Sequence, residues 1–414
     1  MANSSQAKEG ACSMTLRDRL FGRIAGVPLD PLFAVLFLLE FVRGAFLVSY
    51  LPSYAADTLN ISASVVGVAV SVHYLADSFA KCLAGYLLDR LPHKPVLIAG
   101  LLLGAASLFA MNVTRSPGVL IAASALLGLG GSPVWLACLS RIDAARRGEQ
   151  MGVLYLFWMA GLGLGPVVTN VLMDISYRGS FSVLLALTVA ATLAAALISF
   201  AGKRKTIVAA GMEEQLREIR KRLKAMGLLL PGMMIQTMAG SLLVPILSRF
   251  AAEQVGLSHA ELSVLMVSGG AAAGLGLIPM GKLSDRFGGR WFLVGGFGTF
   301  GASVFAVSFA RSFGEAELLA CLLGLSYAAL LPAWNAQLAG YVPESSSGVG
   351  WGMVSAVEGI GVVLGPLAGG WLSDRFGLPM PFRVCAVLFA LIAAVYVSQG
   401  AANDPLPALQ VDHR

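Results

Sequence analysis

Long apolar runs alternate with short polar connections along almost the whole chain. Each run has about 20 residues, the length that an α-helix needs to cross a bilayer. Few charged residues interrupt these runs. The pattern predicts six membrane spans, a basic connection and six more spans. We place them at approximately 31–54, 63–89, 95–112, 117–140, 150–173, 180–201, 227–250, 259–281, 291–310, 316–341, 349–372 and 380–399.

The composition agrees with a polytopic membrane protein. Of the 414 residues, 57% are hydrophobic and 13% are charged, whereas a soluble domain has about 25% charged residues. The fold class that follows is an all-α integral membrane protein. The five cysteines are scattered and form no close pair, so we expect neither disulfides nor a metal site.

The lysines and arginines are distributed unevenly over the loops. Most of the 29 fall in the two tails, in the central connection and in the other loops that follow even-numbered spans. Basic residues remain on the cytoplasmic side of a membrane, so both termini are expected in the cytoplasm of a plasma-membrane protein, and the net charge of +6 needs no nucleic-acid partner. We divide the chain into a cytoplasmic tail, a first six-helix bundle, a basic cytoplasmic linker, a second bundle and a second cytoplasmic tail, at 1–29, 30–202, 203–226, 227–400 and 401–414.

The two halves of the chain repeat each other at a nearly constant offset. GYLLDR at 85–90 is matched by GKLSDR at 281–286, and PVW at 133–135 by PAW at 332–334. GLGLGP at 161–166 is matched by GVVLGP at 361–366, and Asp174 by Asp374. A parallel repeat of this kind places a substrate site between the halves, near the middle of the membrane.

With these motifs, residues 30–400 resemble the major facilitator superfamily. The loop after the second span follows the family pattern G-x-x-x-D-R-x-G-R-R, except that Pro92 and His93 replace a glycine and an arginine. The copy at 281–290 is closer to the pattern. The resemblance implies twelve helices in two parallel six-helix halves. It also implies a cytoplasmic gate formed by Asp89, Arg90, Lys94, Asp285 and Arg286.

The stretch 161–166 resembles the fifth-span motif of antiporters in this superfamily. Glycines let helices pack closely, and Pro166 can bend the span. Close packing explains the motif without any further role, so the resemblance implies antiport but does not require it.

Several ionisable residues lie inside predicted spans, where a charge costs roughly 2.5–3.5 kcal/mol. Glu40 and Arg43 share one helical face, and His73, Asp77 and Lys81 form a stripe along another helix. Such a line of groups indicates a proton path or a substrate-contact line. Protonation of either carboxylate would break an ion pair. The alternative is a set of static pairs that hold the first half together.

Trp135 and Trp158 lie deep in the fourth and fifth spans, where they can serve as sugar platforms or as helix filler. Glu40, Arg43, Asp77 and the two tryptophans together resemble the cavity set of this superfamily's proton-coupled glycolipid flippases, which act in the lipoteichoic acid pathway. The resemblance implies that these residues bind a sugar headgroup and that Glu40 or Asp77 carries the proton.

The second half has fewer ionisable residues within its spans. Asn335 and Glu358 are its candidate substrate contacts, and Glu358 is also a candidate second protonation site. A polar first half and an apolar second half suit an amphipathic substrate, with the headgroup on one side and the acyl chains on the other. An apolar drug would suit them too.

These observations predict a proton-coupled antiporter that moves a glycolipid from the inner to the outer leaflet. The alternatives are proton-driven efflux of drugs or other small molecules, and a receptor or enzyme on the same scaffold. The stretch 276–283 imitates a phosphate-binding loop, but Leu283 replaces the required Ser or Thr. We therefore expect no ATP, no cofactor and no enzymatic activity, and a monomer that contacts membrane lipids.

Overall fold

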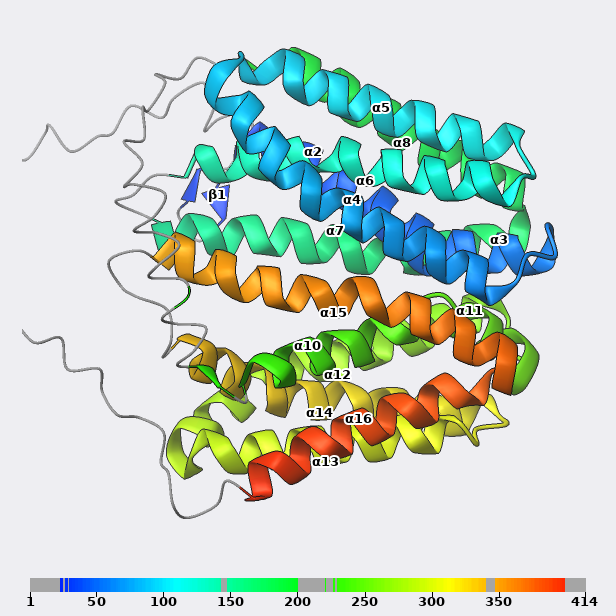
Figure 1. Cartoon of the computed structure of the whole chain (residues 1–414), viewed down its shortest axis with the longest axis vertical. Coiled ribbons are helices and arrows are strands. Elements are labelled where there is room, and N and C mark those ends of the chain that lie inside the picture. The colour runs from blue at the N-terminus through cyan, green and yellow to red at the C-terminus, as the bar shows by residue number, and fades with distance from the viewer. Residues whose placement is uncertain are drawn as a thin grey trace, which may run out of the picture.

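The computed structural model describes residues 30–142, 147–199, 229–339 and 347–398, together with short pieces at 23–24, 27–28, 220 and 226–227. Nearly all of this is helical, and the long helices run side by side (Figure 1). The two-residue strands β1 (Arg23–Ile24) and β2 (Val27–Pro28) pair in antiparallel fashion. Most of the first tail, the whole second tail and most of the predicted linker lie outside the described residues.

The first half contributes six spans. The first of them, Pro31–Asp57, is continuous but changes its helical winding twice. The elements are α2 (Pro31–Gly44), the π-helical η1 (Ala45–Tyr50), α3 (Leu51–Asp57), α4 (Ala63–Arg90), α5 (His93–Val113), α6 (Pro117–Ser140), α7 (Arg147–Ile175) and α8 (Tyr177–Leu197).

The second half is built in the same order. Its first span is bent by 50° between α10 and the segment 247–255. Among the described residues, eleven other helices are long and apolar enough to cross a membrane, and the bent pair, counted as one span, is the twelfth. The elements are α10 (Leu229–Leu242), α11 (Leu247–Phe250), the π-helical η3 (Ala251–Val255), α12 (His259–Phe287), α13 (Gly289–Val307), α14 (Phe313–Ala339), α15 (Ser347–Phe376) and α16 (Pro379–Ser398).

The start of the first span has a local cause. The Asp30 carboxylate accepts a hydrogen bond from the Leu32 amide at 3.0 Å, and Pro31 follows at the first helical position. An acidic N-cap followed by proline is a strong signal for a helix start. The Arg141 guanidinium lies 3.2 Å from the same carboxylate, so this residue also ties the beginning of the first span to the end of the fourth.

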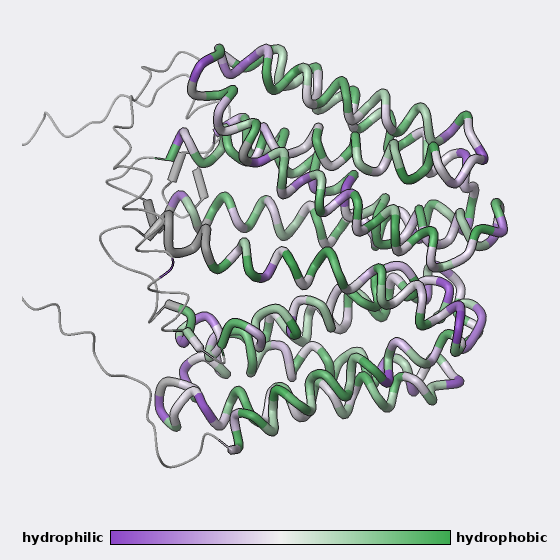
Figure 2. The backbone as a smooth tube through the Cα atoms, viewed as in Figure 1, coloured by the Kyte–Doolittle hydropathy of each residue, from purple (hydrophilic) through white to green (hydrophobic). Residues whose placement is uncertain are grey.

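The helices form two groups, with α2 to α8 in one and α10 to α16 in the other (Figure 1). Helices α4, α6 and α12 finish at the end of the molecule that we call the basic end, which carries Arg90, Lys94, Arg141, Lys282, Arg286 and Arg290. The other end, where α4 and α12 begin, is called the opposite end. Hydrophilic residues gather at both ends, and the lengths between them are mainly hydrophobic (Figure 2).

Glycines of the repeated motif bring helices into backbone contact within each half. A β-carbon at Gly165 would overlap the Phe41 carbonyl oxygen, so α7 lies directly against α2. In the second half, a β-carbon at Gly365 would overlap the Met238 carbonyl oxygen, so α15 lies in the same way against α10. Small residues allow helices to approach this closely in a membrane, and the motif therefore packs helices together in both halves.

Candidate functional site

A cavity of about 1510 Å³ lies between the two halves. It is lined by α2, α4, α5, α6, α7 and α8 on one side and by α14 and α15 on the other. Its wall runs from Glu40 and Arg43, inside the first span, to Ile142 and Met151 near the basic end. This is larger than the typical pocket for a drug-sized ligand, which has about 300–1,000 Å³.

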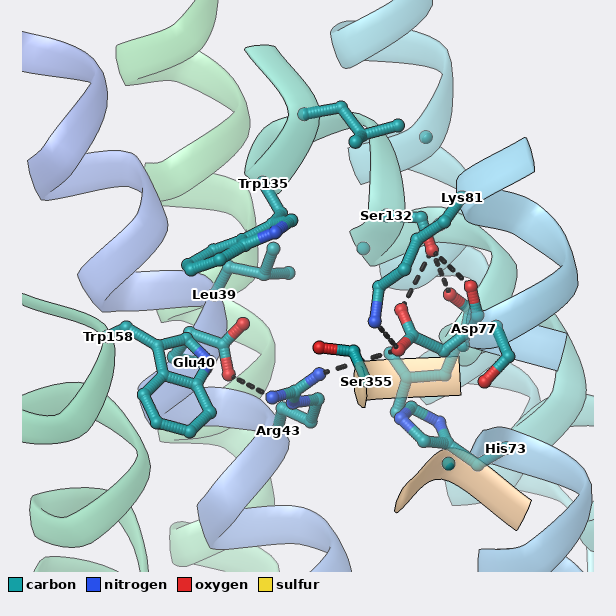
Figure 3. Close-up of a pocket in the computed structure, with 18 of the residues that line it drawn as sticks. Leu39, Glu40, Arg43, His73, Asp77, Lys81, Ser132, Trp135, Trp158 and Ser355 are labelled. Carbon is teal, nitrogen blue, oxygen red and sulfur yellow. Dashed lines mark hydrogen bonds and ion pairs between the residues drawn. The ribbon is translucent and has the colours of Figure 1, made fainter. Parts of the chain in front are cut away.

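Four charged side chains form one connected row in this cavity (Figure 3). The Arg43 guanidinium lies 2.6 Å from the Glu40 carboxylate and 3.9 Å from the Asp77 carboxylate. The Lys81 ammonium lies 2.9 Å from Asp77 on its other side. Two acids and two bases therefore alternate, and the row is neutral as a whole.

The carboxylates of this row are buried, whereas its outer cation is not. The Glu40 and Asp77 side chains are 4% and 10% exposed, but that of Lys81 is 44% exposed. A buried charge that loses its partner is strongly destabilising. Each carboxylate can therefore take up a proton when its cation moves away, and Lys81 has the most room to move.

Two serines of α6 contact the middle and the first residue of the stripe on α4. The Ser132 hydroxyl on α6 donates a hydrogen bond to Asp77 Oδ1 at 2.8 Å. His73 Nδ1 lies 3.1 Å from the Ser124 carbonyl, and because a carbonyl can only accept, this nitrogen is the donor. Nε2 of His73 is buried and has no hydrogen-bond partner among the described residues. Sequence reasoning missed Ser132, which lies beside the PVW motif but carries no charge.

Three aromatic rings form a wall at the side of the cavity. Trp135 lies with its ring centre 6.3 Å from that of Trp158, and the Tyr155 ring meets them at 5.7 and 6.2 Å, respectively. Tyr155 lies on the same helix as Trp158, one turn earlier, and is 45% exposed. Tyr155 was not among the predicted site residues, although its i, i+3 spacing to Trp158 places both on one helical face.

The second half supplies the opposite wall. Asn335, Ser355 and Glu358 are its polar lining residues, and the remainder of this wall is apolar, with Ala356, Ile360, Val363 and Leu364. Trp334, the repeat partner of Trp135, is 2% exposed and packs edge-on against Phe297 in the core of the second half. The repeat in sequence is therefore not a repeat in the cavity.

The residues that the sequence assigns to a gate lie at the basic end. The Arg90 guanidinium lies 3.7 Å from the centre of the Tyr86 ring, and that of Arg286 lies 5.4 Å from the Phe287 ring. Lys94 lies on the first turn of α5 and is partly exposed. The side chains of Asp89 and Asp285 lie outside the described residues. Within the described ranges, no group of three or more His, Cys, Asp or Glu residues is placed to hold a metal ion.

At the opposite end the two halves are in contact. Asp374 on α15 accepts hydrogen bonds from the first amides of α4, and Asp174 on α7 accepts them from the first amides of α12. A β-carbon at Gly67 would overlap the Pro366 carbonyl oxygen, so α4 and α15 also meet backbone to backbone. These contacts close the opposite end.

A sequence profile of the Major Facilitator Superfamily matches residues 32–230 and again residues 229–411. Among solved structures, the nucleoside transporter NupG superposes with a TM-score of 0.71, at 15% identity and over 89% of this chain and 98% of that one. A mutant of NupG gives a TM-score of 0.75, also at 15% identity, over 90% and 99%.

Curated relatives are more similar in sequence. The proton-coupled antiporter flippase LtaA of Staphylococcus saprophyticus subsp. saprophyticus is 34% identical over 87% of this chain and 92% of its own length. The proteins of the same name from Staphylococcus haemolyticus and Staphylococcus aureus (strain MSSA476) are 32% and 31% identical, over 87% and 89% of this chain and 92% and 94% of their own lengths.

Proposed function

Because the chain belongs to the Major Facilitator Superfamily, we propose that it is a proton-coupled antiporter that flips an amphipathic glycolipid, of the lipoteichoic acid anchor type, from one leaflet to the other. The chain is a multi-pass membrane transporter, and relatives at 31–34% identity are named proton-coupled antiporter flippases. The observation that carries the proposal is the neutral row of Glu40, Arg43, Asp77 and Lys81 in the wall of a large cavity.

The proton-coupling role is assigned to this row together with His73. A proton that binds Glu40 or Asp77 takes the place of a cation, so the row can exchange partners without leaving a buried charge unpaired. Arg43 contacts both carboxylates and is the group that transmits the change between them. A membrane potential supplies about 2.3 kcal/mol per elementary charge per 100 mV, which one carboxylate is enough to use.

The substrate site is assigned to the two facing walls of the cavity. The faces of Trp135 and Trp158, extended by Tyr155, offer stacking surfaces for sugar rings, and Glu40, Arg43 and Asp77 offer hydrogen bonds to hydroxyl groups. Asn335 and Glu358 complete the polar contacts from the second half. The apolar stretch 360–364 of α15 is suited to acyl chains, so a headgroup and its chains can be held on different walls.

Orientation follows from the distribution of basic residues. We assign the basic end to the cytoplasm of a plasma-membrane protein, with both termini on that side and 203–226 as a cytoplasmic linker between two bundles at 30–202 and 227–400. The cavity is then accessible from the cytoplasm while the outer end is closed. Asp89, Arg90, Lys94, Asp285 and Arg286 form the gate that closes the cytoplasmic side in the other state. We propose that one chain, a monomer without cofactor, performs the cycle.

One alternative is supported by the apolar wall of the second half, which would also accept an apolar drug. The same row would then drive efflux of small molecules. The cavity volume favours the lipid, because it exceeds what a drug-sized ligand fills. The polar groups and aromatic rings of the first half also suit a substrate with a hydroxyl-rich headgroup.

The test uses protein reconstituted in liposomes with an imposed pH gradient, and it follows a fluorescent glucosyl diacylglycerol crossing the bilayer. We expect the gradient to accelerate flipping in the wild type and to have no effect in Glu40→Gln or Asp77→Asn. Glu253→Gln, which removes a carboxylate outside the cavity, should behave like the wild type. Proton flux that appears with cationic drugs and not with the lipid would establish efflux instead.

A further inference from the structure

The two carboxylates that close the opposite end are repeat partners, and neither belongs to the cavity. The Asp374 carboxylate accepts from the Ala63 and Ser64 amides at 3.1 and 2.8 Å. The Asp174 carboxylate accepts from the His259 and Ala260 amides at 3.2 and 2.8 Å. In each case an aspartate near the C-terminus of a helix in one half caps the first turn of a helix in the other half. We call these contacts the Asp374 latch and the Asp174 latch.

The physical basis of both latches is the same. The first amides of a helix have no partner within the helix, and the helix N-terminus carries a partial positive charge that attracts carboxylates. In order to expose the cavity at the opposite end, the halves must separate here, and both carboxylates must leave their amides. The latches therefore favour the state seen in this structure.

The two latches differ in the residue at the first helical position. In the Asp374 latch this is Ala63, which adds no polar side chain. In the Asp174 latch it is His259, whose Nδ1 lies 2.9 Å from the Asp174 carboxylate. Helix α12 also has its own capping box, formed by Ser258 and Glu261, whereas Ser62 makes no side-chain cap for α4. The histidine is therefore not needed to begin α12.

The described groups that face the imidazole are two carboxylates and a phenol, each from a different element. Besides Asp174 on α7, Asp57 on α3 lies 4.0 Å from Nε2, and the Tyr177 hydroxyl on α8 lies 3.1 Å from it. The same hydroxyl donates to Asp57. The His259 side chain is 19% exposed and Asp57 is 47% exposed, so water can reach the cluster from the opposite end.

We propose that His259 is a proton-binding site separate from the cavity row, and that its protonation strengthens the Asp174 latch. The inference rests on the proposed function as a proton-driven transporter. Both carboxylates that face the imidazole, Asp57 and Asp174, belong to the first half. An imidazolium on α12 therefore gains both partners in the latched state and loses both when the halves separate. By linkage, acid on this side stabilises the latched state and alkali favours its release. The test therefore spans the range of about pH 5 to 8, in which histidine side chains as a class change charge.

The experiment measures opening of the opposite end without any transport. Spin labels are attached at Arg115→Cys and Arg311→Cys, which lie in exposed connections of the first and second halves, after the native cysteines have been replaced. Distances are then recorded in detergent between pH 5 and 8.5. In the otherwise unchanged protein, we expect the ratio of closed to open molecules to rise about fivefold toward acid, the upper range for an exposed ion pair.

The decisive variant is His259→Ala, which converts the Asp174 latch into a copy of the Asp374 latch. We expect the closed-to-open ratio of this variant to lose the fivefold rise toward acid. His259→Gln should lose it too, although its side-chain amide can still donate a hydrogen bond to Asp174. Both proteins retain the cavity carboxylates, so the difference between titrations isolates His259. Asp374→Asn should lower closure at every pH and leave the pH dependence intact.

An unchanged titration in both His259 variants would overturn the inference. The result does not depend on flipping. If the titration responds to His259 while the liposome assay shows no proton-driven lipid movement, the latch site stands and the proposed function fails. If the liposome assay shows proton-driven lipid movement and the titration does not respond to His259, the proposed function stands and the latch site fails.

Discussion

Arg43 on the first span lies 3.9 Å from Asp77 on the second, and this contact joins two ion pairs that would otherwise be separate. Glu40 is held on one side of the guanidinium and Asp77 on the other. A change of protonation at either carboxylate alters the charge that the guanidinium faces. The four side chains of the row are therefore connected as one unit.

Removing the shared cation should be costly for the fold. In Arg43→Met, Glu40 is left buried without its ion-pair partner, and breaking a buried pair in this way costs about 3–5 kcal/mol. We expect a clear loss of thermal stability in detergent, measured by the unfolding of the purified protein. The double variant Arg43→Met with Glu40→Gln removes both charges and should recover most of that loss. A single variant as stable as the wild type would show that Glu40 is already neutral.

The aromatic wall can be tested ring by ring. We expect Trp135→Ala, Trp158→Ala and Tyr155→Ala each to weaken the apparent affinity for a glucosylated lipid about two- to tenfold, because an aromatic contact is worth about 0.5–1.5 kcal/mol. Tyr155→Phe keeps the ring and should lose less than Tyr155→Ala. Affinity is read from the lipid concentration at half-maximal flipping.

The control for this wall is a lipid without sugar. Flipping of plain diacylglycerol, if the protein supports it, should respond much less to these substitutions. Equal losses for both lipids would mean that the rings support packing rather than headgroup binding.

The glycine contacts between α2 and α7 predict position-specific damage. Gly165→Val should destabilise the protein by about 1–3 kcal/mol or more, because the added atoms meet the Phe41 carbonyl and overpacking has costs of this size. Gly163 lies two residues earlier on the same helix, and a β-carbon there would meet nothing within 4 Å. Gly163→Val is thus the matched control and should unfold at nearly the wild-type temperature. Similar losses at both positions would indicate a general effect on helix α7.

The orientation of the protein has a direct chemical test. In a protein without native cysteines, a membrane-impermeant thiol reagent added outside intact cells should label Arg115→Cys and Arg311→Cys. It should label Lys94→Cys only after the cells are opened. Labelling of Lys94→Cys in intact cells would reverse the assignment of the basic end to the cytoplasm.

Hydropathy and helical periodicity were sufficient to predict the membrane spans and the pairing of Glu40 with Arg43, because both features depend on neighbouring residues within one helix. The ends of helices were less predictable. Helix α15 continues to Phe376, beyond the apolar run that we placed at 349–372, and carries Asp374 with it. A polar residue past an apolar run gives no local sign that the helix continues.

Contacts between distant segments could not be predicted in the same way. The repeat identified Asp174 and Asp374 as partners, but not the amides that they cap, which belong to the other half. Trp135 and Trp334 are equivalent in sequence, yet one lines the cavity and the other lies in a core. Their surroundings are set by the helices packed around them, and single-residue identity does not report that packing.

The Asp374 latch has a consequence for biosynthesis. The Asp374 carboxylate and the Ala63 amide that it caps are 311 residues apart in the chain, and the ribosome adds Ala63 long before Asp374. Helix α4 must therefore enter the membrane with its first amides uncapped, and it acquires its cap only when the eleventh span arrives. The first half cannot attain its final form alone, and assembly of the second half completes the start of a helix made long before it.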